Sequence, residues 1–400
     1  MEAAKIADLS GGINNLACVD RMPAKHARDL LNLDPAPGGG LTQRCSKVRA
    51  LALSAVTGGI PSHDGFLIVD GGNVKRFNTQ TGELRDLIAI PGATGIVGAV
   101  LGSETIAAVG GQLFRYRDNQ LHRADLQPVQ PHIFVSAGRL PAGIYRVAVT
   151  AVDSLGIEYG TQSAVFGLSE GSAVQVEWSN PAGADHCRLY MSTCNGEVLY
   201  LQRDKAASPQ SIDLVADDTA RLEVDGLDCP MQPSVIAAYK GRMAYAAGHV
   251  LQLSKPYAPH LVDLIADCYL YAAPITVIAP TDGGIFVCTE TETHFLSGAG
   301  TTDVSTRRVL SIGAVKGSCV PLRDGAVAWM TERGQAIGRA DGTVGLPQER
   351  TYAPGMPVHA AAGVIEAAGV EVIATAPKGV IKNSRIGVVD AFDMEIVNAP

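Results

Sequence analysis

A glycine-led unit recurs along this chain at a spacing of about 42 residues, and this repeat constrains the fold more than any other feature. Gly283 and Gly325 each follow an aspartate, open an apolar segment and lie 42 residues apart. Gly241 opens a similar segment 42 residues before Gly283. A period of about 40 residues is typical of the four-stranded blades of a β-propeller. The repeat therefore predicts an all-β propeller.

Each copy of the unit begins with a turn and an apolar strand, followed by a second turn and a strand that alternates in polarity. Residues 71–77 and 110–116 show the second half of the pattern. Glycine suits these turns because two-residue hairpin turns require positive φ, which costs other residues about 1 kcal/mol or more. Since the two chain ends often complete one blade together, six copies predict five to seven blades. The copies begin near residues 64, 103, 240, 282, 324 and 368. An ordinary β-sandwich with coincidental spacing is the alternative.

The composition agrees with many short strands joined by turns. Of 400 residues, 46% are hydrophobic, and the 44 glycines and 22 prolines exceed what long helices would tolerate. The formal net charge is −8 without a run of like charges, which argues against a sequence-independent grip on nucleic acid. No segment has the apolar length of a signal peptide or a membrane span, so we expect folding in a cytoplasm and no membrane span.

The repeat is interrupted between residues 130 and 227 by a segment with a different rhythm. Residues 143–153 and 172–178 alternate apolar and polar positions, as half-buried antiparallel strands do. Asn195 and Gly196 form a strong hairpin signal. The segment resembles an immunoglobulin or fibronectin type III-like β-sandwich without the paired core cysteines of antibody domains. Its predicted core aromatic residues are Tyr145, Trp178 and Tyr190.

These patterns divide the chain into four parts. We predict an N-terminal arm at 1–46, a first propeller part at 47–128, the fibronectin III-like insertion at 129–229, and a second propeller part at 230–400. Within the arm, we expect a short helix from Ala24 to Leu33 that reaches a neighbouring subunit. The alternative for the arm is a strand that closes the propeller.

Cysteine and histidine are scattered and do not form a recognisable metal or catalytic motif. The eight cysteines include no CxxC pair, so we expect them to be reduced, and Cys288 and Cys319 lie in apolar runs where a thiol packs as a small hydrophobic group. The nine histidines include no HExxH. His294, between Thr293 and Phe295, is predicted to have a structural role.

Acidic residues at repeat positions could in principle form a glycosidase pair. Asp64, Asp282 and Asp324 each precede a glycine, however, so we interpret them as residues that support turns through local hydrogen bonds. The sequence has no GxSxG, no Walker loop and no dinucleotide fingerprint, and the glycines at 38–40 are typical of a flexible connection. We therefore predict no catalytic, cofactor-binding or metal-binding residues, no cofactor, and no enzymatic activity.

Four segments of the chain have recognisable motifs: the N-terminal run from Leu9 to Asn15, the run from Gly39 to Arg44, and the segments 241–256 and 282–297. These segments resemble the tail nozzle proteins of bacteriophages, similar to tail tubular protein B. It implies a structural virion component: a nozzle or hub ring, usually a hexamer, below the adaptor or tail tube. The chain is shorter than the long nozzle proteins of some short-tailed phages, so a minimal nozzle and a hub in a longer tail both remain open.

The resemblance also implies partners and a location. Such a ring is a homo-oligomer that contacts other tail proteins, including the adaptor, tail tube and fibres, and genomic DNA passes through it without sequence-specific binding. A negative lumen would repel phosphates and let DNA slide. The protein would be made in the host bacterial cytoplasm and reside in the virion tail. The alternatives are a receptor- or carbohydrate-binding propeller and a propeller hydrolase.

Overall fold

The computed structural model describes residues 8–9, 11–17, 21–28, 33–35, 41–43, 51–367 and 370–381. Throughout these residues the regular structure is β-strand, and no α-helix occurs among them, which confirms the all-β prediction. The chain divides into two compact units, one of Ser54–Tyr271 and one of Met1–Leu53 with Ala272–Pro400.

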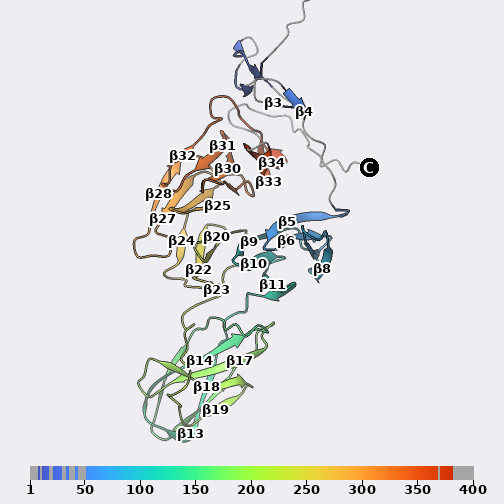
Figure 1. Ribbon diagram of the computed structural model, residues 1–400. Coiled ribbons are helices and arrows are strands. Elements are labelled where there is room, and N and C mark those ends of the chain that lie inside the picture. The colour runs from blue at the N-terminus through green and yellow to red at the C-terminus, as the bar shows by residue number, and fades with distance from the viewer. Residues whose placement is uncertain are drawn as a thin grey trace, which may run out of the picture. The chain divides into compact units, whose positions relative to one another are not determined.

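The unit Ser54–Tyr271 contains three antiparallel blade sheets and the inserted sandwich (Figure 1). Blade 1 consists of β5 (Val56–Ser62), β6 (Gly65–Asp70), β7 (Asn73–Phe77) and β8 (Leu84–Ala89); blade 2 of β9 (Ile96–Leu101), β10 (Glu104–Val109), β11 (Gln112–Arg117) and β12 (Gln120–Arg123); blade 3 of β20 (Val235–Tyr239), β21 (Arg242–Ala247), β22 (Val250–Lys255), β23 (Ala258–Val262) and β24 (Cys268–Leu270). In blade 3, strand β22 pairs with β23 near its end and with β24 near its start.

The other unit contains two more four-stranded blades and a long two-stranded hairpin. Blade 4 consists of β25 (Ile275–Thr281), β26 (Gly284–Thr289), β27 (Thr293–Ser297) and β28 (Ser305–Leu310); blade 5 of β29 (Val320–Pro321), β30 (Val327–Thr331), β31 (Gly334–Gly338) and β32 (Val344–Gly345); and the hairpin of β33 (Met356–Ala367) and β34 (Val370–Ile381). The blades confirm the propeller architecture. The sixth predicted copy, near residue 368, contributes to this hairpin instead of a four-stranded blade within the described residues.

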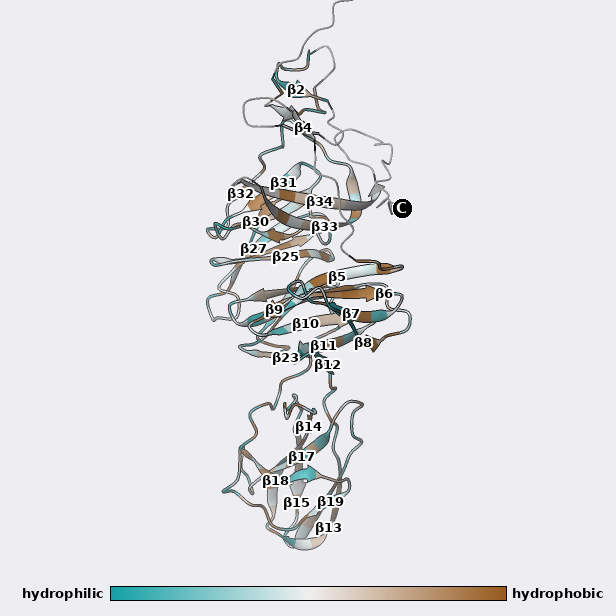
Figure 2. Ribbon diagram, turned by 45° about the vertical axis from the view of Figure 1, so that its right-hand side comes forward, coloured by the Kyte–Doolittle hydropathy of each residue, from teal (hydrophilic) through white to brown (hydrophobic). Residues whose placement is uncertain are grey.

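The recurring unit coincides with the second and third strands of each blade, not with the first and second. The segments after Gly65, Gly241 and Gly283 are β6, β21 and β26, each the second strand of its sheet. These strands are the most deeply buried, and β26 is buried at every position. Figure 2 shows the same hydrophobic character in β6. The first strands were missed because they are more exposed and irregular in sequence, as in β5.

The turns adopt the conformation that the glycines predicted. Gly71 and Gly72 both have positive φ (58° and 80°), and Gly110 and Gly111 repeat this geometry at the equivalent turn of blade 2. In blade 3, the first position of such a turn is Lys240, with φ of 45°. A two-residue turn of this type matches the twist of the strands that it joins.

Adjacent blades within each unit share hydrophobic clusters. Val69 of blade 1 packs in one cluster with Phe114 of blade 2, and Leu113 of blade 2 packs in another with Met243 of blade 3. In the second unit, Phe286 of blade 4 and Trp329 of blade 5 have ring centroids 5.2 Å apart. Blades therefore pack face to face through their buried second and third strands.

The insertion forms a sandwich of a three-stranded and a four-stranded antiparallel sheet, as predicted. The orders are β13-β16-β19 and β15-β14-β17-β18. The Asn195–Gly196 signal lies in the connection between β17 and β18, which pair as a hairpin. The strands are β13 (His132–Leu140), β14 (Gly143–Val152), β15 (Ala164–Leu168), β16 (Ser172–Glu177), β17 (His186–Ser192), β18 (Leu199–Ala206) and β19 (Gln210–Ile212).

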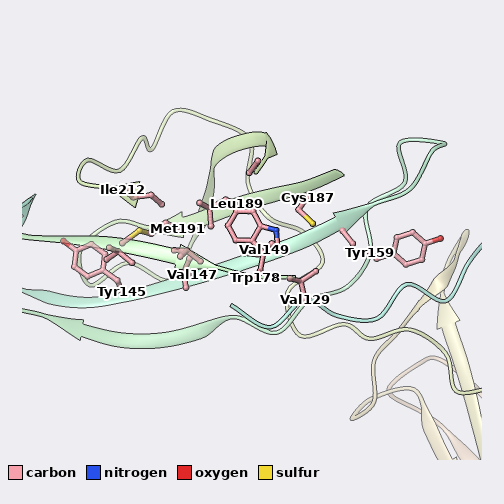
Figure 3. Close-up of a cluster of buried hydrophobic side chains, with 14 of the residues drawn as sticks. Val129, Tyr145, Val147, Val149, Tyr159, Trp178, Cys187, Leu189, Met191 and Ile212 are labelled. Atoms are coloured by element: carbon pink, nitrogen blue, oxygen red, sulfur yellow. The ribbon is translucent and has the colours of Figure 1, made fainter. Parts of the chain in front are cut away.

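Two of the three predicted aromatic residues lie in the sandwich core. Trp178 is central to the cluster, with Tyr145 toward one end and Tyr159 at the other (Figure 3). Tyr190 is also buried but belongs to a separate cluster with Ala148, on the other face of the four-stranded sheet. Its side chain faces outward because alternate residues of a strand point to opposite faces.

The predicted helix from Ala24 to Leu33 is wrong over its described residues. His26–Ala27 form strand β2, which pairs in parallel with β1 (Gly12–Ile13), and Leu33 begins strand β3 (Leu33–Pro35), which pairs with β4 (Leu41–Gln43). Lys25 has φ of 72°, which a right-handed helix excludes, and Pro23 starts a turn in which its carbonyl accepts from the amide of His26. Residues 29–32 of the predicted helix lie outside the described residues.

Candidate functional site at the joint between sandwich and blades

The sandwich is joined to the blades by two chain segments that are held at both ends. In the first, Ala124 packs in the core between blades 2 and 3, while Leu126 and Val129 pack in the sandwich core. The segment is anchored further by Asp125, whose carboxylate accepts from the amide of Leu113 and pairs with Arg123 at 2.7 Å. The segment therefore packs in both hydrophobic cores and does not form a flexible hinge.

The second segment returns from the sandwich to blade 3 through backbone hydrogen bonds. The amide of Gly226 donates to the carbonyl of Thr161 at 2.9 Å, which fixes the segment to the sandwich. Two residues later, Asp228 exchanges two backbone hydrogen bonds of 2.9 Å with Val262 of β23. Bonds on both sides of residue 227 make this crossing as constrained as the first.

Between the two crossings, a buried arginine and a buried histidine connect three parts of the unit. Arg115 of β11 places its Nη2 3.2 Å from Nδ1 of His260 of β23, and both side chains are more than 90% buried. Nε2 of His260 lies 3.1 Å from the backbone carbonyl of Glu158 in the sandwich. Blade 2, blade 3 and the sandwich thus meet at one imidazole ring.

The hydrogen-bond partners determine the protonation of His260. A guanidinium can only donate, so Nδ1 must accept and the ring proton lies on Nε2, where it donates to the Glu158 carbonyl. Burial, reinforced by the positive charge of Arg115, lowers the pKa of His260 to about 3. The ring is therefore neutral at physiological pH.

Arg115 is a buried cation with one carboxylate partner. Its Nε lies 3.2 Å from Oε2 of Glu104, which also pairs with Arg117 at 3.2 Å. Removing one member of such a buried pair leaves an uncompensated charge, which costs about 3–5 kcal/mol. The joint therefore depends strongly on this arginine.

The side chain of Glu158 extends the joint across the outer face of the four-stranded sheet. Its carboxylate accepts hydrogen bonds from the hydroxyls of Thr150 and Tyr190, the latter at 2.8 Å, and pairs with Arg188 at 3.2 Å. Burial and the bond to Glu158 raise the pKa of Tyr190, so its hydroxyl stays protonated. The side chain of Glu158 thus binds the four-stranded sheet, and its backbone carbonyl binds His260.

Tyr159 completes the joint from the sandwich side. Its hydroxyl donates toward the carbonyl of Arg123 at 3.1 Å and lies 3.2 Å from Oδ2 of Asp153, and its ring centroid is 4.9 Å from that of His260. Burial, followed by the nearby Asp153, raises the pKa of Tyr159. These groups are buried and mutually bonded, so they suit the fixing of orientation and not the binding of a substrate.

The three aspartates that the sequence singled out do not behave as a catalytic pair. Asp282 occupies the turn between β25 and β26, and Asp324 accepts from the amide of Ala326 at 3.0 Å within its own turn. Asp64 does more than support a turn: its Oδ2 accepts from Arg76 at 2.8 Å and from Tyr116 of blade 2 at 3.0 Å. It therefore ties blade 1 to blade 2.

The pKa of Asp64 shifts in the direction opposite to that of a general acid. Burial would raise the pKa, but the hydrogen bonds from Ser62, Arg76 and Tyr116 outweigh this effect and hold it below the ordinary value. The same contact, after burial, raises the pKa of Tyr116 to about 12. A glycosidase acid requires a raised carboxyl pKa.

The other residues named from the sequence have structural environments. Cys288 and Cys319 pack in the core between blades 4 and 5, and burial raises the pKa of Cys319 to about 12. The six described cysteines are free. His294 lies 3.1 Å from Glu292, which also pairs with Arg308.

Sequence reasoning missed Arg115, His260 and Glu158. Arg115 and His260 lie 145 positions apart, and each occupies an ordinary polar position of a strand. The sequence contained one signal: the charged Arg115 lies between two aromatic residues, Phe114 and Tyr116, within one strand. Within the residues that the structure describes, no group of three or more His, Cys, Asp or Glu could hold a metal ion, and no helix is long and apolar enough to cross a membrane.

Comparison with known proteins finds distant structural likenesses only. No protein-family model and no curated protein matches the chain. Among solved structures, KlHsv2 with loop 6CD replaced by a Gly-Ser linker is 10% identical with a TM-score of 0.32, covering 80% of this chain and 89% of that one. The streptogramin B lyase structure is 11% identical with a TM-score of 0.34, covering 78% and 89%. Virginiamycin B lyase from Staphylococcus aureus is 8% identical with a TM-score of 0.28, covering 73% and 83%. The comparisons assign no activity or partner to this chain.

Proposed function

We propose that this protein is a structural component of a bacteriophage tail, a nozzle or hub ring that works by homo-oligomeric assembly. The observation that carries the proposal is the joint at His260, which mounts the sandwich on the blades through buried polar contacts. The resemblance of the N-terminal segment and of residues 241–256 and 282–297 to tail proteins supplies the location.

A fixed mounting is what an assembly protein requires. When a module binds a neighbour in a ring, each degree of freedom that becomes restricted lowers the affinity. Preorganisation of the module removes this cost. The crossings at Leu126 and Asp228 and the buried bonds of Arg115 remove that freedom before assembly. A protein whose sandwich only trailed from a flexible linker would not need them.

The N-terminal motif that carries part of the resemblance makes defined contacts within its own unit. The amide side chain of Asn15 forms two hydrogen bonds with the backbone of Ala353, accepting at 2.9 Å and donating at 2.8 Å. Asn14 is buried and accepts from the amide of Ala17 at 3.0 Å. We infer that this motif makes a docking contact, which in the ring is made within the same chain or to a neighbouring copy.

The proposal is tested by the mass of the purified full-length protein together with the protein content of the parent particle. Mass photometry over a range of concentrations should find a discrete oligomer, and proteomics of purified virions should find the chain at several copies per particle. A chain that stays monomeric and is absent from virions would refute the proposal.

A carbohydrate-binding role is the second candidate, and one aromatic ring favours it. Tyr257 is 83% exposed, and its ring lies across Gly241, so it is held as a flat surface on blade 3. A glycan array would decide: hits that disappear in Tyr257→Ala but persist in Leu270→Ala, an exposed control on the same blade, would support this second role. An empty array would exclude it.

A further inference from the structure

The acidic character of the protein is concentrated in the sandwich. Residues 129–229 contain 6 Lys and Arg against 13 Asp and Glu, a net charge of −7, whereas the rest of the chain contains 26 against 27, a net charge of −1. The overall charge of −8 therefore belongs almost entirely to one module. A charge asymmetry of this kind indicates a module with a partner of its own.

One part of the outer face of the four-stranded sheet in this module is apolar, away from Glu158 and Arg188, and only half of this part is covered. Tyr190 and Leu199 are buried there, with Leu222 of a later segment packed against them. That segment is held along β18 by the amide of Leu222, which donates to the carbonyl of Leu199 at 2.9 Å. The half toward β18 is thus closed by the chain itself.

The half of the face toward β15 is open. Ile144 of β14 is 57% exposed and Val165 of β15 is 59% exposed. Ile144 pairs with Gly167 and Arg146 pairs with Val165, so Ile144 and Val165 are diagonal neighbours on one face, about 7–8 Å apart. Gly167 between them leaves open space where a side chain would otherwise lie. We call Ile144, Val165 and Gly167 the open face.

Exposed acidic residues border the open face at the end of the sheet where β14 begins. Glu170 accepts from the amide of Ala142, two residues before Ile144, at 2.9 Å. Asn195, whose side chain accepts from the amide of Ile144 at 3.0 Å, places the turn with Glu197 beside the same end. The open face is thus a small aliphatic patch at the edge of an acidic module, with Arg146 on the same face opposite Val165.

Charge selects the occupant of this face. DNA and anionic membranes are repelled by a module of net charge −7. A second copy offers no complement, because its sandwich has the same charge and the rest of its chain is nearly neutral. Aliphatic side chains also lack the flat rings on which sugars stack. We propose that the open face docks a different protein, with a basic surface around an apolar centre.

This inference rests on the proposed function and adds to it. If the protein forms a tail ring, the sandwich makes the contact with a second, basic tail protein, whereas the contacts between copies belong to other surfaces. The buried joint at His260 holds the sandwich in a fixed direction for that contact.

The test uses the full-length protein and two fluorescent peptides, one of alternating leucine and lysine and one of alternating leucine and glutamate. Anisotropy should show binding of the leucine–lysine peptide at low salt, weakened at 0.5 M salt because screening shortens the reach of charge to about 4 Å. The double variant Ile144→Ser/Val165→Ser should weaken binding by about tenfold or more, since it removes two apolar contacts. Ile265→Ser, which alters a 95% exposed isoleucine of blade 3, should leave binding unchanged.

A charge variant tests the second part of the inference. Glu197→Lys should weaken binding of the leucine–lysine peptide severalfold, whereas Asp303→Lys in blade 4 should not. The proposal is overturned if the two peptides bind equally, if neither binds, or if a DNA duplex binds more strongly. It is also overturned if a control variant, Ile265→Ser or Asp303→Lys, weakens binding as much as the variant with which it is compared. Mass photometry of the same variants separates the two claims: an oligomer with no peptide binding refutes the docking face alone, and a monomer refutes the ring.

Discussion

Replacing His260 with glutamine should change the pH dependence of stability as well as its magnitude. The pKa of this ring is about 3 in the folded protein against an ordinary value of 6.5. Below about pH 6.5, His260 is protonated in the unfolded chain but stays neutral in the folded chain. Folding stability is therefore highest above that pH and decreases progressively toward pH 3. At pH 5 the loss amounts to about 2 kcal/mol, from about 1.5 pKa units at 1.36 kcal/mol each.

Urea unfolding followed by tryptophan fluorescence can measure this difference locally. The chain has two tryptophans, and in a Trp329→Phe background the remaining reporter is Trp178, in the sandwich core. At pH 7, His260→Gln should be less stable by about 1–3 kcal/mol, because the flexible amide does not reproduce both hydrogen bonds of the ring or its contact with Tyr159. At pH 5 the gap should shrink by about 2 kcal/mol, since glutamine does not titrate. A gap of the same size at both pH values would refute the assignment of a buried, neutral His260.

Three further substitutions test the contacts described above. Arg115→Met should destabilise the unit Ser54–Tyr271 by about 1–3 kcal/mol in the same urea assay, because Nδ1 of the buried His260 loses its donor and Glu104 keeps only Arg117 as a partner; no measurable effect would contradict the joint. Gly283→Ala should lower the melting temperature, since its Cβ would meet the carbonyl oxygen of Ala340 at 1.7 Å and the resulting strain is worth about 1–3 kcal/mol or more. Asn15→Ala should expose the N-terminal segment to limited proteolysis by removing both bonds to Ala353, while Asn73→Ala, at the start of a blade 1 strand, should not.

The repeat predicted the blades because spacing and turn chemistry are local properties. Two-residue hairpin turns require positive φ, which glycine adopts at little cost, so the glycines at 71, 72, 110 and 111 located these turns without a structure. The first strands of the blades were not identified, because strands such as β5 are more exposed and lack the apolar run of β6. Local patterning therefore identified the hairpins but not their position within each sheet.

The joint could not be predicted because it depends on contacts between residues far apart in sequence. His260 and Glu158 are 102 positions apart, and neither lies in a motif. The short helix expected from Ala24 to Leu33 was wrong for a different reason: Lys25 adopts positive φ, and His26 pairs with Gly12. Tertiary pairing overrode the local preference there.

The most direct test of the account is a cryo-EM reconstruction of the purified full-length protein under conditions that promote assembly. We expect a closed homo-oligomeric ring in which every sandwich is resolved in the same orientation relative to blades 2 and 3. Monomeric particles alone, or a ring in which the sandwich density is averaged away by motion, would contradict it.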